Sequence, residues 1–329
     1  MNMLTLEGVE IEGLAAYVPA NEVRNDAKVA QATGIVTRRI VPAGTTVVDL
    51  CVKAAEKVLA DTGAAPSDFG AILCVSFTQR DRMPAAAIQA QARLGFPKDI
   101  IAFDVSLACS GWVYGLYLAG LLVRQTGKKV LLLDGDVQSD RATDENVRCL
   151  LGDAGTATVI GVRDQGSGIR DLGSGIRDQV SGIRDRGSGI GDREWRFSFF
   201  ADGEKGAALK MADGGAIEMD GFGVFRFVAT DVVAATRDFL SDLKPQTSNL
   251  SFVPHQPNVY MVRQLAKSVG IDEVRTMVSC DTLGNLSSAS IPVTLVRRQV
   301  RGKALLAGFG GGLSISLALV DLDCRLSLA

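Results

Sequence analysis

The sequence predicts an α/β fold made of two similar halves. Short runs of apolar and β-branched residues alternate with stretches of helical apolar spacing. This rhythm occurs both before and after a Gly- and Ser-rich segment in the middle of the chain. Strands that are apolar throughout and separated by helices are typical of a parallel or mixed sheet covered on both faces. The repeated rhythm indicates an internally duplicated fold.

The first half alternates predicted strands with predicted helices. Strand-like apolar runs cover residues 70–76, 100–105, 129–134 and 154–160. Helical spacing covers residues 84–94 and 111–125. The longest apolar run, residues 111–123, is shorter than the roughly 20 residues that a membrane-spanning helix needs, so we expect a buried core helix there.

The second half resumes the same pattern. Predicted strands cover residues 251–254, 275–279, 303–308 and 314–320, and predicted helices cover residues 258–269 and 287–298. This second α/β set completes the expected duplication.

A low-complexity segment divides the two halves. The motif Ser-Gly-Ile-Arg-Asp begins at residues 167, 174 and 181, and a degenerate copy begins at residue 188. The period of seven would suit a coiled coil, but each repeat holds a single Ile, and each Gly disfavours a helix interior by about 1 kcal/mol. We therefore expect a solvated insertion at residues 163–193 between halves at 1–162 and 194–329; a partner-docking arm is the alternative.

Composition and charge narrow the class of protein. Apolar residues make up 47% and charged residues 22% of the chain, the balance of a globular protein, and the formal charge of -2 argues against a nucleic-acid-binding surface. The six cysteines are widely spread without a C-x-x-C pair, which indicates reduced thiols rather than disulfides or a zinc site. The N-terminus has no signal-peptide pattern. We expect a cytoplasmic protein that binds neither nucleic acid nor a membrane.

Cys109 is the first candidate for chemistry. It lies between a predicted strand that ends near Val105 and a predicted helix that begins just after it. A thiol at a helix N-terminus faces unpaired N–H groups and the positive end of the helix dipole, and both favour the thiolate that attacks acyl groups. The alternative is a buried structural cysteine, the usual state of a free cysteine.

His255 is the only histidine in the chain, so any histidine-dependent acid–base chemistry must use it. It follows a predicted strand and precedes a predicted helix. Loops at strand ends are where the catalytic groups of α/β sheets concentrate. The alternative is a hydrogen-bonded histidine that only supports a turn.

Asn285 and a glycine run complete the candidate set. Asn285 follows Gly284 before a predicted helix, where its amide can donate a hydrogen bond to an oxyanion or, alternatively, only cap the turn. Residues 310–312 are consecutive glycines, which allow the backbone to present N–H groups to a carbonyl oxygen. The run lacks the form of a phosphate-binding loop and taken alone is only a turn signal.

Four motifs in this order resemble those of β-ketoacyl-acyl-carrier-protein synthase III enzymes. They are Ala-Cys-Ser-Gly-Trp at 108–112, Val-Pro-His-Gln at 253–256, Gly-Asn-Leu-Ser-Ser-Ala-Ser at 284–290 and Phe-Gly-Gly-Gly at 309–312. The likeness covers nearly the whole chain apart from the repeats, and includes residues 34–35, residues 151–155, and Gly221 with Val224 and Phe225. Such a set is specific to the superfamily and much less specific to a substrate.

The resemblance implies a thiolase-like five-layered αβαβα fold of two duplicated halves, and a homodimer. It implies that Cys109 takes an acyl group from a thioester of coenzyme A or of acyl carrier protein, without a permanently bound cofactor. A malonyl-type thioester would then lose carbon dioxide, and His255 and Asn285 would hold the enolate that attacks the acyl-cysteine. Backbone N–H groups of Cys109 and Gly311 would form the oxyanion hole. The pathway would be fatty-acid initiation or specialised metabolite synthesis.

The resemblance also implies substrate-binding positions, some of which depart from the family. Gly221 and Asn258 match the family, whereas Met83 stands at a position, commonly Phe, that reaches across the dimer to floor the acyl pocket. A flexible thioether there would suit a longer or bent acyl chain. Residues 30–33 are Ala-Gln-Ala-Thr, where the family usually has Asp-Glu-Trp-Ile. Tyr260 stands where the family has a basic residue that is used for the carrier. These departures favour a carrier-protein thioester or an unusual acyl-CoA as the first donor.

Three other functions stay open. A 3-hydroxy-3-methylglutaryl-CoA synthase-like enzyme would need a glutamate base before residue 84, where residues 76–84 offer only Asp81. An acyltransferase that forms an ester or amide would release no carbon dioxide. A non-catalytic partner subunit is the third, and the intact Cys, His and Asn argue against it. A papain-like protease is rejected because the surrounding motifs are missing.

Overall fold

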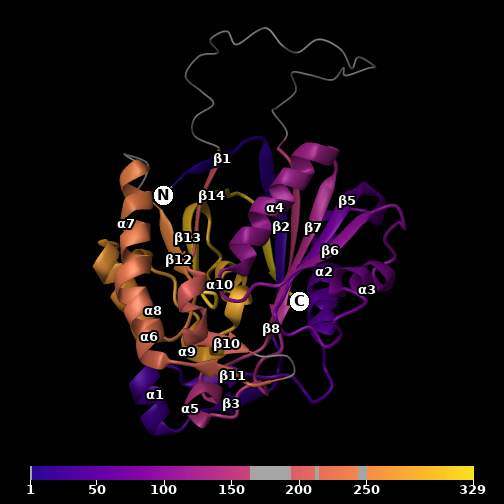
Figure 1. Cartoon of the computed structure of the whole chain (residues 1–329). Coiled ribbons are helices and arrows are strands. Elements are labelled where there is room, and N and C mark those ends of the chain that lie inside the picture. The colour runs from indigo at the N-terminus through magenta and orange to yellow at the C-terminus, as the bar shows by residue number, and fades with distance from the viewer. Residues whose placement is uncertain (1, 164–193, 212–214, 244–249) are drawn as a thin grey trace.

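The computed structural model describes residues 2–163, 194–211, 215–243 and 250–329. One mixed sheet is built mainly from the N-terminal part of the chain (Figure 1). In spatial order its strands are β15 (Arg325–Leu328), β2 (Val9–Tyr17), β8 (Ala154–Val162), β7 (Lys129–Asp136), β5 (Phe69–Val75) and β6 (Ile101–Val105). The strand β5 runs parallel to both neighbours, whereas β8 is antiparallel to β7 and to β2.

A second sheet is built mainly from the C-terminal part. In spatial order its strands are β1 (Leu4–Leu6), β9 (Trp195–Ala201), β14 (Ser314–Leu322), β13 (Gly302–Gly310) and β12 (Ser251–Pro254). The pair β12 and β13 is parallel, and the other pairs are antiparallel. The ends of the chain cross over, because β1 joins this second sheet while β15 joins the first. Each sheet therefore contains one terminal strand from the opposite end of the chain.

Helices form three layers around the two sheets (Figure 1). Between the sheets, α4 (Gly111–Thr126) and α10 (Ser290–Arg298) share an apolar core with the inner faces of both. The outer face of the first sheet packs against α2 (Val47–Thr62) and α3 (Ala86–Arg93). The outer face of the second packs against α7 (Val233–Asp242) and α8 (Val259–Val269). The predicted five-layered αβαβα architecture is confirmed.

Short elements surround the strand ends. The pairs β3 (Glu22–Arg24) with β4 (Thr37–Arg39) and β10 (Leu209–Met211) with β11 (Ile217–Met219) form small antiparallel ladders. The short helices are α1 (Ala27–Thr33), α5 (Glu145–Arg148), α6 (Gly221–Phe227) and α9 (Cys280–Leu283). Within the described ranges, no helix has both the length and the apolar character that crossing a membrane would require.

One predicted strand, residues 275–279, is wrong. Arg275 ends a 3₁₀ turn, and Thr276 makes only an isolated bridge to the sheet. The side-chain amide of Gln256 occupies the main-chain positions that a ladder would use: its Nε2 donates to the carbonyl oxygen of Met277 at 3.0 Å, and its Oε1 accepts from Ser279 N at 2.9 Å. After the single bond from Met277 N to Phe252 O of β12, a polar side chain therefore takes the place of further ladder pairing.

The other predicted elements are present, with small differences at their ends. The helix expected from residue 287 starts as a 3₁₀ turn, Ser287–Ala289, and becomes α-helical only at Ser290. The insertion expected at residues 163–193 lies, apart from Arg163, outside the described residues. The pattern did not predict β2, α2, β9 or α7, nor the short elements β1, β3, β4, α1, α5, β10, β11, α6, α9 and β15.

Candidate active site

Loops from several strand ends meet at a cavity. Cys109 precedes α4, His255 directly follows β12, and Asn285 lies in the loop between α9 and α10. All three line one cavity of about 370 Å³. Cys109 and Asn285 also line a second cavity of about 350 Å³. The structure thus brings together three candidates that are far apart in the sequence.

Burial dominates the surroundings of Cys109. The residue is 8% exposed, and its Sγ lies 3.9 Å from Ser287 Oγ. Burial raises the pKa of the Cys109 thiol to about 12, and the charge of Asp136 adds to that rise; the Ser287 hydroxyl and the backbone of Cys109 and of Gly311 oppose it only in part. Burial thus favours the thiol over the thiolate that the sequence led us to expect, because loss of hydration outweighs the favourable groups at the helix start.

His255 is buried and held from its backbone. Its backbone N–H donates to the carbonyl oxygen of Ala307 at 2.8 Å. Its ring packs edge-on against Phe309, with ring centroids 5.4 Å apart. Burial lowers the pKa of the imidazole to about 3, and a backbone hydrogen bond with Ser287 opposes that shift only in part. Nδ1 has no hydrogen-bond partner among the described residues. A neutral imidazole therefore stands in the cavity wall.

Asn285 is fixed through both its main chain and its side chain. Its N–H donates to Leu150 O at 2.8 Å, and its carbonyl oxygen accepts from Gln138 Nε2 at 2.8 Å and from Gly152 N at 2.9 Å. Its side-chain Oδ1 accepts from Ser287 N at 2.9 Å. Because Oδ1 is engaged in the turn, the amide nitrogen is the polar group left for the cavity. The capping and functional interpretations of Asn285 are thus compatible.

The glycine run approaches the sulfur closely. A Cβ at Gly310 would lie 2.8 Å from Cys109 Cβ and 3.0 Å from Sγ, so no side chain fits there. The next residue, Gly311, hydrogen-bonds the sulfur through its backbone. The absence of side chains lets the backbone after β13 reach the position where a carbonyl bound over the sulfur would place its oxygen.

The second cavity is mainly apolar. Its walls come from the segment before Cys109, from α5 with the residues that follow it, and from the β10–β11 ladder. The apolar side chains that line it are Phe77, Leu107, Val147, Leu150, Leu151, Leu209, Met211, Ile217 and Met219. Such a cavity, opening beside a thiol, suits an apolar chain attached to the sulfur.

Two of the three predicted substrate-binding residues line a cavity of this chain, and the third does not. Gly221 and Asn258 both line the cavity of about 370 Å³ that contains His255. The Asn258 side chain also caps α8, because its Oδ1 accepts from Met261 N at 2.9 Å. Met83 is 87% exposed and lines neither cavity of its own chain.

Two polar residues near the sulfur were not predicted. Ser287 has a positive φ of 54° and touches the Cys109 sulfur, and Asp136 is fully buried at the end of β7. A signal for Asp136 was available, because Asp134 and Asp136 interrupt an otherwise apolar strand. In the described part of the chain, no group of three or more His, Cys, Asp or Glu side chains is arranged to hold a metal ion.

Two family models match the sequence. The model for 3-oxoacyl-[acyl-carrier-protein] synthase III matches residues 103–176, and the model for the C-terminal part of that enzyme matches residues 246–322. The β-ketoacyl-[acyl-carrier-protein] synthase III of Syntrophomonas wolfei is 31% identical over 312 residues, which cover 87% of this chain and 86% of that protein.

Solved structures agree with the sequence matches. The 3-oxoacyl-(acyl-carrier protein) synthase from Burkholderia xenovorans superposes with a TM-score of 0.86 and 28% identity, over 99% of both chains. The priming β-ketosynthase from the R1128 polyketide biosynthetic pathway superposes with a TM-score of 0.80 and 27% identity, over 96% of this chain and 97% of that one. Both of these structural similarities extend across both sheets.

Proposed function

The chain belongs to the β-ketoacyl-[acyl-carrier-protein] synthase III family, and on that premise we propose that Cys109, His255 and Asn285 carry out its two-step condensation. The protein is an acyltransferase of the condensing type. We assign the nucleophile to a first half, residues 1–162, and His255 and Asn285 to a second half, residues 194–329, with residues 163–193 inserted between them. The convergence of the three side chains on one cavity supports the assignment most strongly.

In the first step, Cys109 Sγ attacks the carbonyl carbon of an acyl thioester. The N–H groups of Cys109 and Gly311 would hold the oxygen as it gains negative charge, and one such donor is worth about 3 kcal/mol in rate. The acyl chain would then occupy the apolar cavity of about 350 Å³. Covalent capture divides one difficult condensation into two easier reactions.

In the second step, a malonyl-type thioester would replace the first donor. As carbon dioxide leaves, the electron pair of the broken bond passes to the thioester carbonyl, whose oxygen accepts hydrogen bonds from His255 and Asn285. A neutral imidazole suits this role, because it can donate a hydrogen bond without first taking up a proton. The carbanion then attacks the acyl carbon on Cys109.

The thioester arm would enter through the cavity that contains His255. Gly221, Phe225, Asn258 and Tyr260 line this cavity. Acyl carrier protein and coenzyme A both carry their acyl group at the end of a long, narrow arm. We therefore propose either one as the partner that delivers the acyl group. The aromatic Tyr260, in place of a basic residue, supports a carrier-linked or unusual coenzyme A donor, in fatty-acid initiation or specialised metabolite synthesis.

Homodimer formation through β6 completes the proposal. This strand ends the first sheet, and Ile101 and Phe103 on it are 43% and 36% exposed. An open sheet edge with exposed apolar side chains favours pairing with another strand. The exposed Met83 precedes α3, near this edge, and would reach the acyl cavity of the partner subunit. All six cysteines are free, as expected in the reducing cytoplasm, where we place the protein.

The experiment that tests the proposed function measures the release of carbon dioxide. Protein incubated with an acyl thioester and carboxyl-labelled malonyl thioester should release label in step with β-ketoacyl product. Acyl transfer without release of label would instead support an acyltransferase that does not decarboxylate. Absence of both acyl transfer and label release would support a non-catalytic subunit and contradict the proposal.

A further inference from the structure

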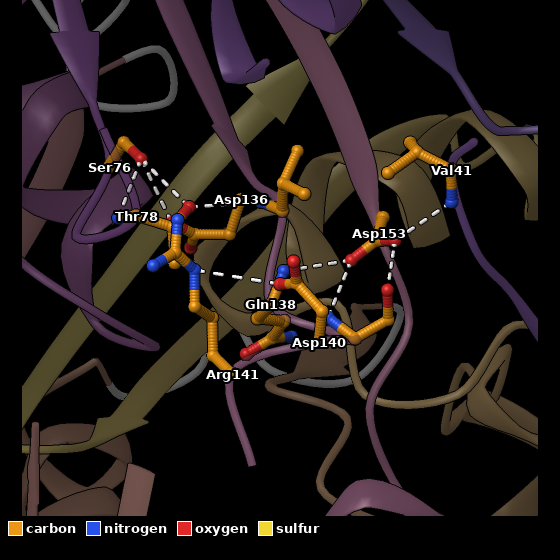
Figure 2. A network of polar contacts seen from close by, with 10 residues as sticks. Val41, Ser76, Thr78, Asp136, Gln138, Asp140, Arg141 and Asp153 are labelled. Carbon is orange, nitrogen blue, oxygen red and sulfur yellow. Dashed lines mark hydrogen bonds and ion pairs between the residues drawn. The ribbon is translucent and has the colours of Figure 1, made fainter. Parts of the chain in front are cut away.

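Asp136 is a buried acid with no part in the mechanism above. It is the last residue of β7 and is 1% exposed. Its Oδ1 accepts hydrogen bonds from Ser76 Oγ at 2.9 Å, from Thr78 Oγ1 at 2.9 Å and from Phe77 N at 3.1 Å. Figure 2 shows this carboxylate at the centre of its hydroxyl donors. Its position and orientation are therefore fixed.

The same carboxylate also faces the turn beside the catalytic cysteine. Ser288 Oγ donates a hydrogen bond to Asp136 Oδ2 at 3.4 Å, and the hydroxyl of the preceding Ser287 is the first of the polar groups that lower the pKa of Asp136. Ser287 Oγ is in turn 3.9 Å from Cys109 Sγ. The Ser287 hydroxyl thus lies close to the sulfur on one side and interacts with the buried carboxylate on the other.

The titratable groups along this path differ in charge state. Burial raises the pKa of Asp136 to about 6, although its hydroxyl and N–H donors oppose the shift. Asp134, two residues earlier on β7, has its pKa raised well above the usual range by burial and then by the charge of Asp136, so it stays protonated when Asp136 ionises. Cys109 remains a thiol at neutral pH. Asp136 is therefore an ionised group that interacts with a thiol that must lose its proton.

His255 is a poor alternative acceptor. Its pKa, lowered to about 3 by burial, means that an imidazolium is strongly disfavoured in this cavity. The imidazole would also have to be neutral again before the second thioester arrives. An acceptor behind the sulfur leaves His255 available for the malonyl carbonyl throughout the cycle.

We propose that Ser287 and Asp136 form a proton relay for Cys109, an inference that rests on the proposed function. In the first step the sulfur–acyl bond forms and the thiol proton passes to Ser287 Oγ while the Ser287 proton passes to Asp136. The bond between the acyl carbon and the donor sulfur breaks, and the donor leaves as a thiolate that takes a proton from water.

In the second step the relay runs in reverse. The carbon–carbon bond to the malonyl unit forms, the bond to the departing carbon dioxide breaks, and Cys109 leaves as a thiolate. Asp136 returns its proton through Ser287, which restores the thiol. One proton from water is consumed in each cycle, as the overall reaction requires. Asp136 touches no reacting atom and is a positioning residue that acts through Ser287.

The test is the pH profile of acyl loading. Protein is mixed with the hexanoyl thioester of pantetheine between pH 5 and 9, and intact mass gives the rate at which Cys109 gains the acyl group. For the wild type we expect the rate to rise with an inflection near pH 6, as Asp136 ionises. Asp136→Asn should load about 100-fold more slowly above the inflection and show no inflection.

Two further variants make the test specific. Asp134→Asn replaces a neighbouring buried acid that is already neutral, so its profile should keep the inflection. Ser287→Gly removes the relay hydroxyl without touching Asp136, and glycine accepts the positive φ of that position. Ser287→Gly should lose the inflection in the pH profile, as Asp136→Asn does. If Asp136→Asn does not fold, the profile of Ser287→Gly alone tests the relay.

Three outcomes overturn the relay. Inflections retained in both Asp136→Asn and Ser287→Gly, or loading rates within about threefold of the wild type, would show that neither residue carries the proton. A wild type whose Cys109 gains no acyl group would overturn the proposed function together with the relay. Loading of Cys109 that is insensitive to both variants overturns the relay alone.

Discussion

Cys109 and His255 share one cavity, and burial acts on both in the direction that removes charge. The thiol pKa is raised to about 12 and the imidazole pKa is lowered to about 3, so at neutral pH both groups are uncharged. A thiolate–imidazolium pair, as expected in a cysteine protease, is therefore disfavoured here. The site therefore favours a neutral imidazole as hydrogen-bond donor. It also favours a thiol that loses its proton only as it attacks the acyl group.

The two hydrogen-bond donors should affect the two half-reactions unequally. His255→Ala and Asn285→Ala each remove a donor to the malonyl carbonyl while leaving the cysteine and its backbone N–H groups in place. We expect decarboxylation to fall by about 100-fold or more and acyl loading to change much less. Loading followed by mass and decarboxylation followed by released carbon dioxide separate the steps. Equal losses in both would contradict the assigned roles.

The buried imidazole should also make the fold sensitive to acid. Its pKa is about 3 in the folded protein, against 6.5 for a solvated histidine side chain. Below pH 6.5 the unfolded chain therefore takes up a proton that the folded chain excludes, and stability falls as pH falls. Between pH 6.5 and 4.5 the wild type should lose up to about 3 kcal/mol more unfolding free energy than His255→Gln.

Urea unfolding at several pH values within this range checks the prediction. Other titrating groups, including Asp136, are present in both proteins, so their contributions cancel in the difference. Parallel losses in the wild type and in His255→Gln would mean that the ring is hydrated and not buried.

At the scale of elements, the end of β13 limits what can surround the sulfur. A methyl group at Gly310 would come within 2.8 Å of Cys109 Cβ, closer than real contacts allow, and 3.0 Å from the sulfur. Gly310→Ala should therefore displace the cysteine, lower the unfolding free energy by about 1–3 kcal/mol and slow acyl loading.

A matched glycine provides the control. A Cβ added at Gly203 would meet nothing within 4 Å, so Gly203→Ala should leave both properties close to those of the wild type. Thermal unfolding and intact mass report on the two effects. Normal acyl loading by Gly310→Ala would show that the turn tolerates a side chain and would remove the packing argument.

Elements were predictable where the local pattern determines them. The strand β12 and the helix α4 follow from apolar runs with clear ends, and both are present as expected. Residues 275–279 look equally strand-like, but a distant side chain, Gln256, takes the hydrogen bonds that a strand would make. Such a substitution depends on tertiary contact and leaves no trace in the local sequence.

At the scale of the whole molecule, the order of four motifs was enough to predict five layers and a cavity that gathers Cys109, His255 and Asn285. The relay residues could not be assigned in the same way. Asp136 and Ser287 lie in different halves, and only the packing of the 287–289 turn against the end of β7 brings them together. Without that packing, Asp136 is only a polar residue in an apolar strand.

The open edge of the first sheet predicts how two chains associate. Phe103→Lys on β6 places a charge on the exposed apolar edge, and light scattering should show a shift from dimer to monomer. Leu328→Lys on β15, at the opposite edge, is 49% exposed and should leave the assembly unchanged. A dimer that persists in Phe103→Lys, or is lost only in Leu328→Lys, would place the interface elsewhere.

The identity of the atom that carries the acyl group tests the account most directly. After incubation with a panel of acyl thioesters, intact mass and peptide mapping should find one acyl group, on the sulfur of Cys109, and none in Cys109→Ala. An acyl group found on any other residue, or loading that survives in Cys109→Ala, would contradict it.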